Sequence, residues 1–161
     1  MTKYTYWTAL LISLTSIIFV FQSRLPLTQF KNMSWDTYCT LQLVPCSPAS
    51  ARFLEEHKLT NSIFSYYDWG GWMIWNYPEI KPSIDGRMHI WENSNGYSAT
   101  ADYNAYENAE KNIDTSPYNT FYLPNDNSPL FLELSNLVQQ NKWKAVYVDD
   151  KAVIVVRLKK K

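Results

Sequence analysis

The chain has 161 residues, with 15 Lys and Arg against 15 Asp and Glu, and 46% of its residues are hydrophobic. This length suits one folded domain of ordinary size, and the balanced charge argues against a nucleic-acid-binding protein, which needs a basic surface. Aromatic residues are abundant, with 7 Trp, 12 Tyr and 7 Phe. Such richness is typical of membrane interfaces and of surfaces that stack on sugars or bind peptides.

The first predicted element is the uncharged segment from Tyr4 to Phe21. As a helix it would be about 27 Å long, close to the roughly 30 Å of a bilayer core, and its aromatic start fits a membrane interface. We therefore predict a transmembrane anchor over residues 1–23 and a single-pass membrane protein. A cleaved signal peptide is an alternative, although the small-residue cleavage pattern is missing after the segment. A buried helix of a soluble protein is a third interpretation.

Residues 24–47 are interpreted as a linker, and they contain the only two cysteines, Cys39 and Cys46. A local disulfide in an oxidising compartment is one interpretation, and two unrelated thiols are the other. If the disulfide forms, the domain that follows lies outside the cytoplasm. The two cysteines have no clustered partners for zinc, and the chain has no phosphate loop or dinucleotide fingerprint. We therefore expect neither a metal nor a cofactor.

The remaining residues, 48–161, are predicted to form an extracytoplasmic α/β domain. Two Ser-Pro pairs mark helix starts, and the run AVIVVRL near the end is strongly strand-like. Helices are predicted over 48–58, 69–76, 98–111 and from 128 onward, and strands over 62–67, 81–85, 143–149 and 152–158, with a loop over 112–127. This order predicts a small, mostly parallel sheet with flanking helices and an antiparallel edge hairpin.

Chemistry-bearing residues follow the predicted strands. Asp68 follows the first strand, where it is also the predicted N-cap of the next helix, Asp85 ends the second, and Asp149 ends the third. Parallel strands end at the same edge of a sheet, so these carboxylates would border one crevice. Aromatic residues and the glycine pair Gly70-Gly71 lie in the same stretch. The spacing of Trp69, Trp72 and Trp75 also fits plain core packing.

Two motifs in this stretch carry a family resemblance. Residues 66–75 read YYDWGGWMIW and residues 83–88 read SIDGRM. Together they resemble the C-terminal extracytoplasmic domain of bacterial multi-spanning glycosyltransferases that use lipid-phosphate-linked sugars, in which a last membrane helix leads into a motif of the form xFNxYxWGGYLIW and then FIDGR. The likeness covers about residues 22–112. Residues 66–70, YYDWG, also resemble the WWDYG motif of oligosaccharyltransferase catalytic subunits, with aromatic residues exchanged.

The resemblance implies a binding domain that is not catalytic alone, because the family's catalytic carboxylates lie between early membrane helices that this chain lacks. Its partners would be a membrane, a multi-spanning glycosyltransferase subunit and a glycan or peptide acceptor. The predicted substrate-binding residues, with Asp68 accepting a hydrogen bond from a substrate hydroxyl, are Tyr66, Tyr67, Asp68, Trp69, Gly70, Gly71, Asp85, Arg87 and Trp91. A stand-alone membrane-anchored scaffold is an alternative. A glycoside hydrolase using Asp68 and Asp85, with His89, is another, since such carboxylates lie roughly 5–9 Å apart.

Overall fold

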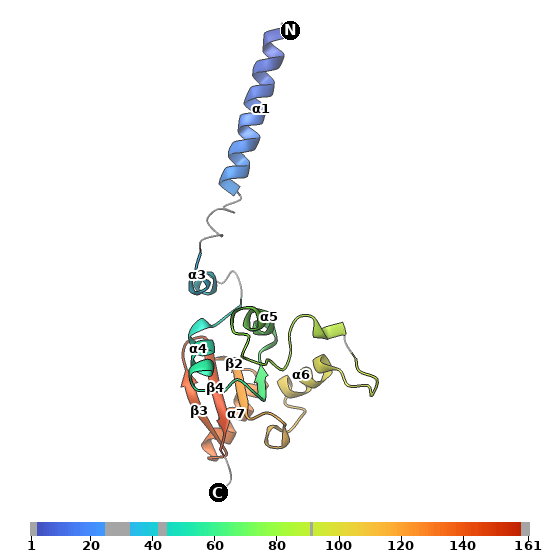
Figure 1. Ribbon diagram of the computed structural model, residues 1–161, viewed down its shortest axis with the longest axis vertical. Coiled ribbons are helices and arrows are strands. Elements are labelled where there is room, and N and C mark those ends of the chain that lie inside the picture. The colour runs from blue at the N-terminus through green and yellow to red at the C-terminus, as the bar shows by residue number, and fades with distance from the viewer. Residues whose placement is uncertain (1–2, 25–32, 42–44, 91, 159–161) are drawn as a thin grey trace. The chain divides into compact units, whose positions relative to one another are not determined.

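The computed structural model (Figure 1) describes residues 3–24, 33–41, 45–90 and 92–158. The chain divides into two compact units, Met1–Tyr38 and Cys39–Lys161. Each unit is described by itself.

The first unit contains the helix α1 (Lys3–Arg24) and the beginning of α3 (Trp35–Thr40). The helix predicted over Tyr4 to Phe21 is confirmed as a helix, and its side chains from Tyr6 to Gln22 are exposed. Its prediction as a transmembrane anchor is not confirmed. No helix in the part of the chain that the structure describes is both long enough and apolar enough to cross a membrane.

The second unit begins with a disulfide. Cys39 and Cys46 are bonded, with their Cα atoms 5.3 Å apart, and both are buried. The interpretation as a local disulfide is therefore confirmed, and that of two unrelated thiols is wrong. The Nζ of Lys151 donates a hydrogen bond to the carbonyl of Cys39 over 3.1 Å, which ties the disulfide-bonded segment to the turn between the last two strands.

The sheet of this unit has four strands in the order β1-β2-β4-β3. They are β1 (Ile63–Ser65), β2 (Thr120–Pro124), β3 (Trp143–Val148) and β4 (Ala152–Arg157). Only β1 and β2 pair in parallel, whereas β4 pairs antiparallel with both β2 and β3. The α/β class and the antiparallel edge hairpin are confirmed. The sheet is mixed, so the prediction of a mostly parallel sheet is wrong.

One predicted strand is in the wrong place. Residues 81–85 form no strand, and the second strand lies instead at 120–124, inside the predicted loop. Pro82 has no N–H to donate to a sheet, and the Oγ of Ser83 accepts the hydrogen bond of the Ser65 N–H over 3.1 Å. Residues 81–85 therefore lie beside β1 without pairing with it as a strand, and β2 takes the pairing position.

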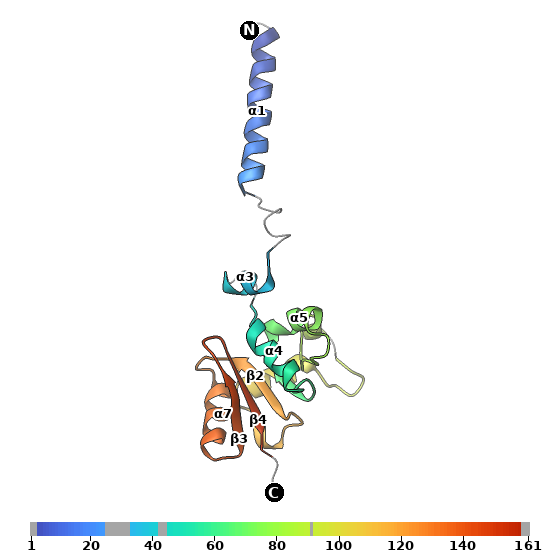
Figure 2. The ribbon, with the colours of Figure 1, turned by 60° about the vertical axis from the view of Figure 1, so that its left-hand side comes forward.

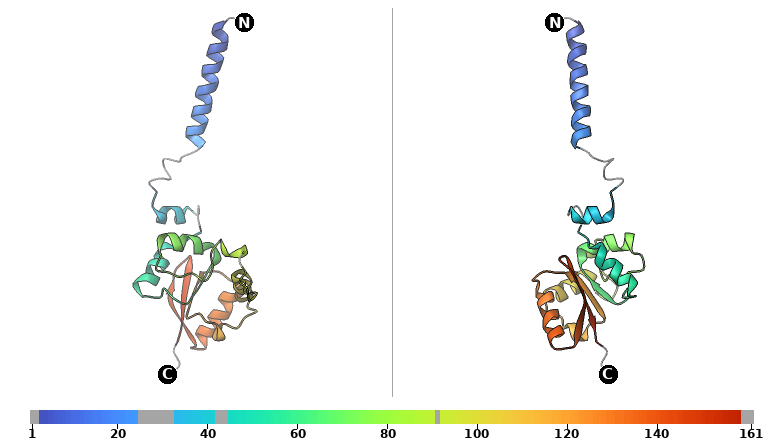
Figure 3. Two further views of the ribbon diagram at one scale, coloured as in Figure 1. Left: turned by 45° about the vertical axis from the view of Figure 1, so that its right-hand side comes forward. Right: turned by 90° about the vertical axis from the view of Figure 1, so that its left-hand side faces the viewer.

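The strands alternate their side chains between two apolar layers, as residues in a strand must. Phe121 and Leu123 face one core with Val153 and Val155, whereas Tyr122 faces the other. Figures 2 and 3 show α7 (Pro129–Gln139) on one face of the sheet and α4 (Pro48–Glu56) on the other. The first core also contains residues of α6 (Ala99–Glu107), and the second contains residues of α5 (Tyr67–Asn76). The second unit is a three-layer α/β sandwich.

Candidate functional site

The candidate site lies where the two parallel strands end. Tyr66, Tyr67 and Asp68 follow β1, and Asp126 follows β2 two residues after its end. Parallel strands deliver the residues after their carboxyl ends to one edge of a sheet. Asp68 therefore lies at this edge, as its position after a strand predicts, but it shares the edge with residues of α6 and not with Asp85.

A cavity of about 280 Å³ opens at this edge. Its lining combines three tyrosines, two carboxylates, one hydroxyl and one amide: Tyr66, Tyr67, Asp68, Thr100, Tyr103, Asn104 and Glu107. We call it the tyrosine pocket. The first three residues come from the start of α5 and the other four from α6. Figure 1 shows α5 above β1, the short green strand, and α6 to the right of it.

Backbone hydrogen bonds position the start of α5. The N–H of Tyr66 donates to the carbonyl of Tyr122 over 3.0 Å, which continues the pairing of β1 with β2. Tyr66 is the N-cap of α5, so the prediction of Asp68 as N-cap is wrong. Asp68 lies instead in the first turn of the helix, where a carboxylate interacts favourably with the helix dipole, and its side chain is exposed.

Tyr103 joins the two walls of the pocket. Its hydroxyl accepts a long hydrogen bond of 3.5 Å from the N–H of Tyr67 and donates one of 3.0 Å to the Oε1 of Glu107. Burial and the neighbouring carboxylate of Glu107 raise the pKa of Tyr103. The phenol therefore stays protonated and holds the Glu107 carboxylate in place.

The electrostatics of the pocket are negative. Burial and the carboxylates of Asp68, Glu107 and Asp126 together raise the pKa of Tyr66 to about 12. Neither Asp68 nor Glu107 forms an ion pair with a Lys or Arg among the described residues. The pocket thus presents hydrogen-bond acceptors whose charge has no protein counterion in the described part of the chain.

Trp69 and Gly70, both predicted to bind substrate, are buried on the other side of the helix. Trp69 packs on Tyr122, with ring centroids 4.6 Å apart. A Cβ on Gly70 would lie 2.1 Å from the carbonyl oxygen of Ile84, whereas one on Gly71 would meet nothing within 4 Å. Gly70 therefore allows α5 to pack against the backbone of residues 84 and 85, and neither Trp69 nor Gly70 reaches the pocket.

Asp85 is buried in an ion pair with Arg87. Its Oδ1 accepts hydrogen bonds from the backbone N–H and the Nε of Arg87, and its Oδ2 accepts one from Nη2, all within 2.9 Å. The hydrogen bonds from the Arg87 side chain lower the pKa of Asp85, against the opposing effect of burial. Asp85 lines neither of the cavities beside it, so the structure does not bring its carboxylate into the site with Asp68.

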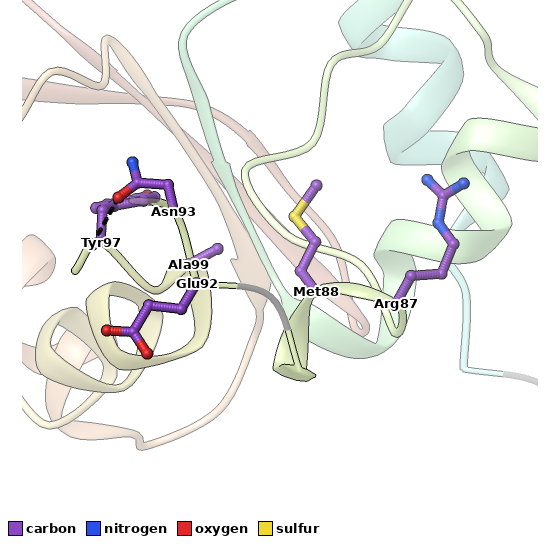
Figure 4. A pocket seen from close by; sticks show the side chains of 6 residues that line it. All are labelled: Arg87, Met88, Glu92, Asn93, Tyr97 and Ala99. Atoms are coloured by element: carbon purple, nitrogen blue, oxygen red, sulfur yellow. Dashed lines mark hydrogen bonds between the residues drawn. The ribbon is translucent and has the colours of Figure 1, made fainter. Parts of the chain in front are cut away.

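Arg87 borders a different, larger cavity of about 450 Å³, with Met88, Glu92, Asn93, Tyr97 and Ala99 (Figure 4). In Figure 4 the Arg87 guanidinium lies on one side of Met88 and the other four residues lie on the other side. Size alone would favour this cavity, but its lining is mostly apolar and its arginine is already paired with Asp85. Trp91 and the side chain of His89 lie outside what the structure describes.

The predicted site thus separates into three groups. Tyr66, Tyr67 and Asp68 share the tyrosine pocket, Arg87 borders the second cavity, and the glycines, Trp69 and Asp85 lie elsewhere. The sequence analysis missed the α6 half of the pocket, which comprises Thr100, Tyr103, Asn104 and Glu107. These four are spaced i, i+3, i+4, i+7, which is the spacing of one helix face, so a search for polar stripes would have found them.

No group of three or more His, Cys, Asp or Glu among the described residues is arranged to hold a metal ion. Comparison with known proteins finds no match to a protein-family model, a curated protein or a solved structure. Functional inference therefore depends on the chemistry of the tyrosine pocket.

Proposed function

We propose that the second unit is a non-catalytic binding domain that takes hydroxyl-rich groups of a glycan or acceptor into the tyrosine pocket. The observation that carries the proposal is the composition of the pocket. Two partly exposed aromatic rings, Tyr66 and Tyr67, stand beside two carboxylates without cationic partners in the described part of the chain. Aromatic rings present apolar faces to sugar rings, and carboxylates accept strong hydrogen bonds from hydroxyls.

The pocket also suits recognition more than hydrolysis by the predicted pair. Asp85 is fully engaged by Arg87 and its side chain is only 2% exposed, so it cannot act with Asp68 on a glycosidic bond. The hydrolase that we predicted from Asp68 and Asp85 is therefore not the function that the geometry favours.

Binding is tested with the full chain in detergent micelles, by titration with a panel of neutral and charged oligosaccharides followed by nuclear magnetic resonance. We expect binding by at least one glycan class, and we expect Tyr66→Ala and Asp68→Ala each to weaken it about tenfold or more. Glu56→Ala, at the exposed end of α4, is the matched control and should leave binding unchanged. If no saccharide or hydroxylated peptide binds, or if both pocket variants bind normally, the proposal fails.

The family relationship and the membrane location are part of the same proposal. The motifs around Asp68 and Asp85 are supporting evidence for a relative of the C-terminal domain of membrane glycosyltransferases. The uncharged segment from Tyr4 to Phe21 within α1, with large apolar side chains such as Phe19 and Ile12 exposed by 72% and 66%, supports attachment to a membrane. The disulfide supports an oxidising, extracytoplasmic compartment. Membrane fractionation tests this: the unaltered chain should resist carbonate extraction, and Leu11→Lys with Ile17→Lys should release it.

A scaffold role is the second candidate, and one observation favours it. Trp75 at the end of α5 is 83% exposed, and Ile90 is 77% exposed, and exposed apolar side chains of this size are typical of protein interfaces. This role differs from the first proposal because it needs no glycosyltransferase partner, and the partner is another membrane protein. Photo-crosslinking from position 75 in native membranes should capture one integral membrane protein, and a repeated absence of any such product contradicts the role.

A further inference from the structure

The tyrosine pocket has a charge pattern that restricts which glycan groups it can hold. Five of its seven lining residues carry a carboxylate or a phenol, and none carries a positive charge: Tyr66, Tyr67, Asp68, Tyr103 and Glu107. Phosphate, sulfate or carboxylate groups would be repelled here, because like charges at short range are unfavourable.

Three carboxylates from three segments act on the same phenol. Asp68 from α5, Glu107 from α6 and Asp126 from the loop after β2 all raise the pKa of Tyr66, in the same direction as burial does. The other wall behaves in the same way, because burial and Glu107 raise the pKa of Tyr103. A neutral ligand would leave this negative charge without a counterion.

We propose that the pocket binds the protonated amine of an amino sugar, with the ammonium group between the Asp68 and Glu107 carboxylates and against the faces of Tyr66 and Tyr67. This inference rests on the proposed glycan-binding function and names the class of sugar. An ammonium group is attracted to tyrosine faces and forms charge-assisted hydrogen bonds to carboxylates. The amide of Asn104 can bond the sugar hydroxyls, and the Thr100 hydroxyl, which donates to the Met88 carbonyl over 3.3 Å, can still accept a hydrogen bond from one.

The test compares disaccharides that share the same rings and differ at C2, which carries an ammonium group, a neutral acetamide or a neutral hydroxyl. The full chain in micelles is titrated with glucosamine disaccharide, N-acetylglucosamine disaccharide and the corresponding glucose disaccharide, at a pH at which the amine is protonated. We expect the amino disaccharide to bind about tenfold more tightly than either neutral sugar. Equal binding of all three overturns the amine inference but leaves glycan binding intact. Binding of none also overturns the amine inference, whereas the proposed function is overturned only if the oligosaccharide panel fails to bind as well.

Substitution of single carboxylates shows which of them cause the preference for the amine. Glu107→Gln and Asp68→Asn should each weaken binding of the amino disaccharide much more than binding of the neutral sugars, and so remove most of the preference for the amine. Glu110→Gln, an exposed carboxylate just after α6, is the matched control and should keep the preference. If Glu110→Gln reduces the preference as much as Glu107→Gln does, the attraction is a general surface effect and the inference fails.

A lysine dipeptide distinguishes the source of the amine. Weaker binding of this dipeptide than of the amino disaccharide supports a saccharide ligand. Equal or stronger binding of the dipeptide overturns the assignment to sugars.

Discussion

Two carboxylates in one short stretch, Asp68 and Asp85, have opposite surroundings. Asp85 is buried, accepts three hydrogen bonds from Arg87 and has a lowered pKa. Asp68 is exposed at the edge of a pocket and faces other acidic groups. A carboxylate whose bonds are all made within the protein stabilises the fold, whereas one left among like charges is available to a ligand.

This contrast extends to the glycines beside them. Gly70 lies against the backbone of Ile84 and Asp85, so it belongs to the closed, structural side of α5. Gly71 is exposed and has open space around its Cα. The helix therefore has one face that specifies the fold and one end that specifies the site.

The largest loss of stability is expected from a substitution on the structural face of α5. Gly70→Ala places a methyl group 2.1 Å from the Ile84 carbonyl oxygen and 2.8 Å from the Cα of Asp85, so backbone must move, and we expect a loss of about 3 kcal/mol in the free energy of unfolding. Gly71→Ala, the adjacent control, should raise stability by about 0.5–1 kcal/mol, because alanine favours the helix. Urea unfolding of both variants measures the difference, and equal effects would contradict the packing of α5.

Removing the charge of Asp85 should cause the next largest loss of stability. Asp85→Asn loses the ionic hydrogen bonds to Arg87, and we expect a loss of about 2 kcal/mol in the free energy of unfolding at pH 7. The loss stays moderate because the Arg87 side chain is 74% exposed and can be hydrated. Chemical unfolding measures it, and a variant as stable as the unaltered chain would show that the pair does not support the fold.

The ion pair of Asp85 and Arg87 makes the stability of the chain depend on pH. Because the pKa of Asp85 is lower when folded than its ordinary value, its contribution is fully present above pH of about 4 and is lost as the pH falls through the folded pKa. The stability difference between the unaltered chain and Asp85→Asn should therefore shrink below pH of about 4. The variant should still lose stability in acid, since hydrogen bonds from Lys142 and Trp143 lower the pKa of Asp114 as well. A difference that is constant from pH 7 to 3 contradicts this account.

The sequence correctly predicts the elements that have a local signal. Ser128-Pro129 correctly marked the start of α7, where the Ser128 hydroxyl accepts the Phe131 N–H, and the turn at Asp149 is held by its carboxylate accepting the N–H groups of Lys151 and Ala152. The strand at 120–124 was missed because its five residues lie between turn-forming residues, and its pairing with β1 spans 57 positions in register, from Ile63 to Thr120. No local pattern encodes such a distant pairing.

The lack of local signals for distant contacts also explains which residues of the site were predicted. Tyr66 to Asp68 were predicted because they follow a strand and carry a recognisable motif. The polar stripe of the α6 residues can be read from the sequence, but only the folded chain shows that it faces the start of α5, where the Tyr103 hydroxyl lies within hydrogen-bonding distance of the Tyr67 N–H. Asp85 was predicted as a site residue because it ends the strand predicted over 81–85. That strand does not form, and the Asp85 carboxylate is paired with Arg87.

Two tyrosines, one in the core and one in the pocket, should show the same contrast with a smaller difference in stability. Tyr122 is buried, and its hydroxyl lies 2.6 Å from the Ser50 Oγ and donates to the Ser47 carbonyl over 3.2 Å. Tyr122→Phe should therefore cost about 1 kcal/mol in the free energy of unfolding, the usual net value of a hydrogen bond. Tyr66→Phe, in the pocket, should change stability by less than about 0.5 kcal/mol, and the phenyl ring should still contact the ligand. Unfolding of both variants in urea measures this, and a larger loss for Tyr66→Phe would place that hydroxyl in the structural framework.

The smallest change in stability is expected for Glu107→Gln. Whether this change is a gain or a loss is informative. Glu107→Gln removes one negative charge from a pocket where Asp68 and Asp126 act on the same phenol as Glu107 does, and the glutamine oxygen can still accept the Tyr103 hydroxyl. We expect no loss of stability, or a gain of up to about 0.5 kcal/mol, because relieved repulsion offsets the weaker hydrogen bond. Residues that serve binding are often not the most stabilising choice at their positions. The measurement is thermal unfolding at low and at high salt, since any gain from relieved repulsion should shrink as salt screens the charges. A salt-independent loss of more than about 1 kcal/mol would mean that Glu107 is a structural partner of Tyr103, and Glu107 would then belong with Asp85 rather than with Asp68.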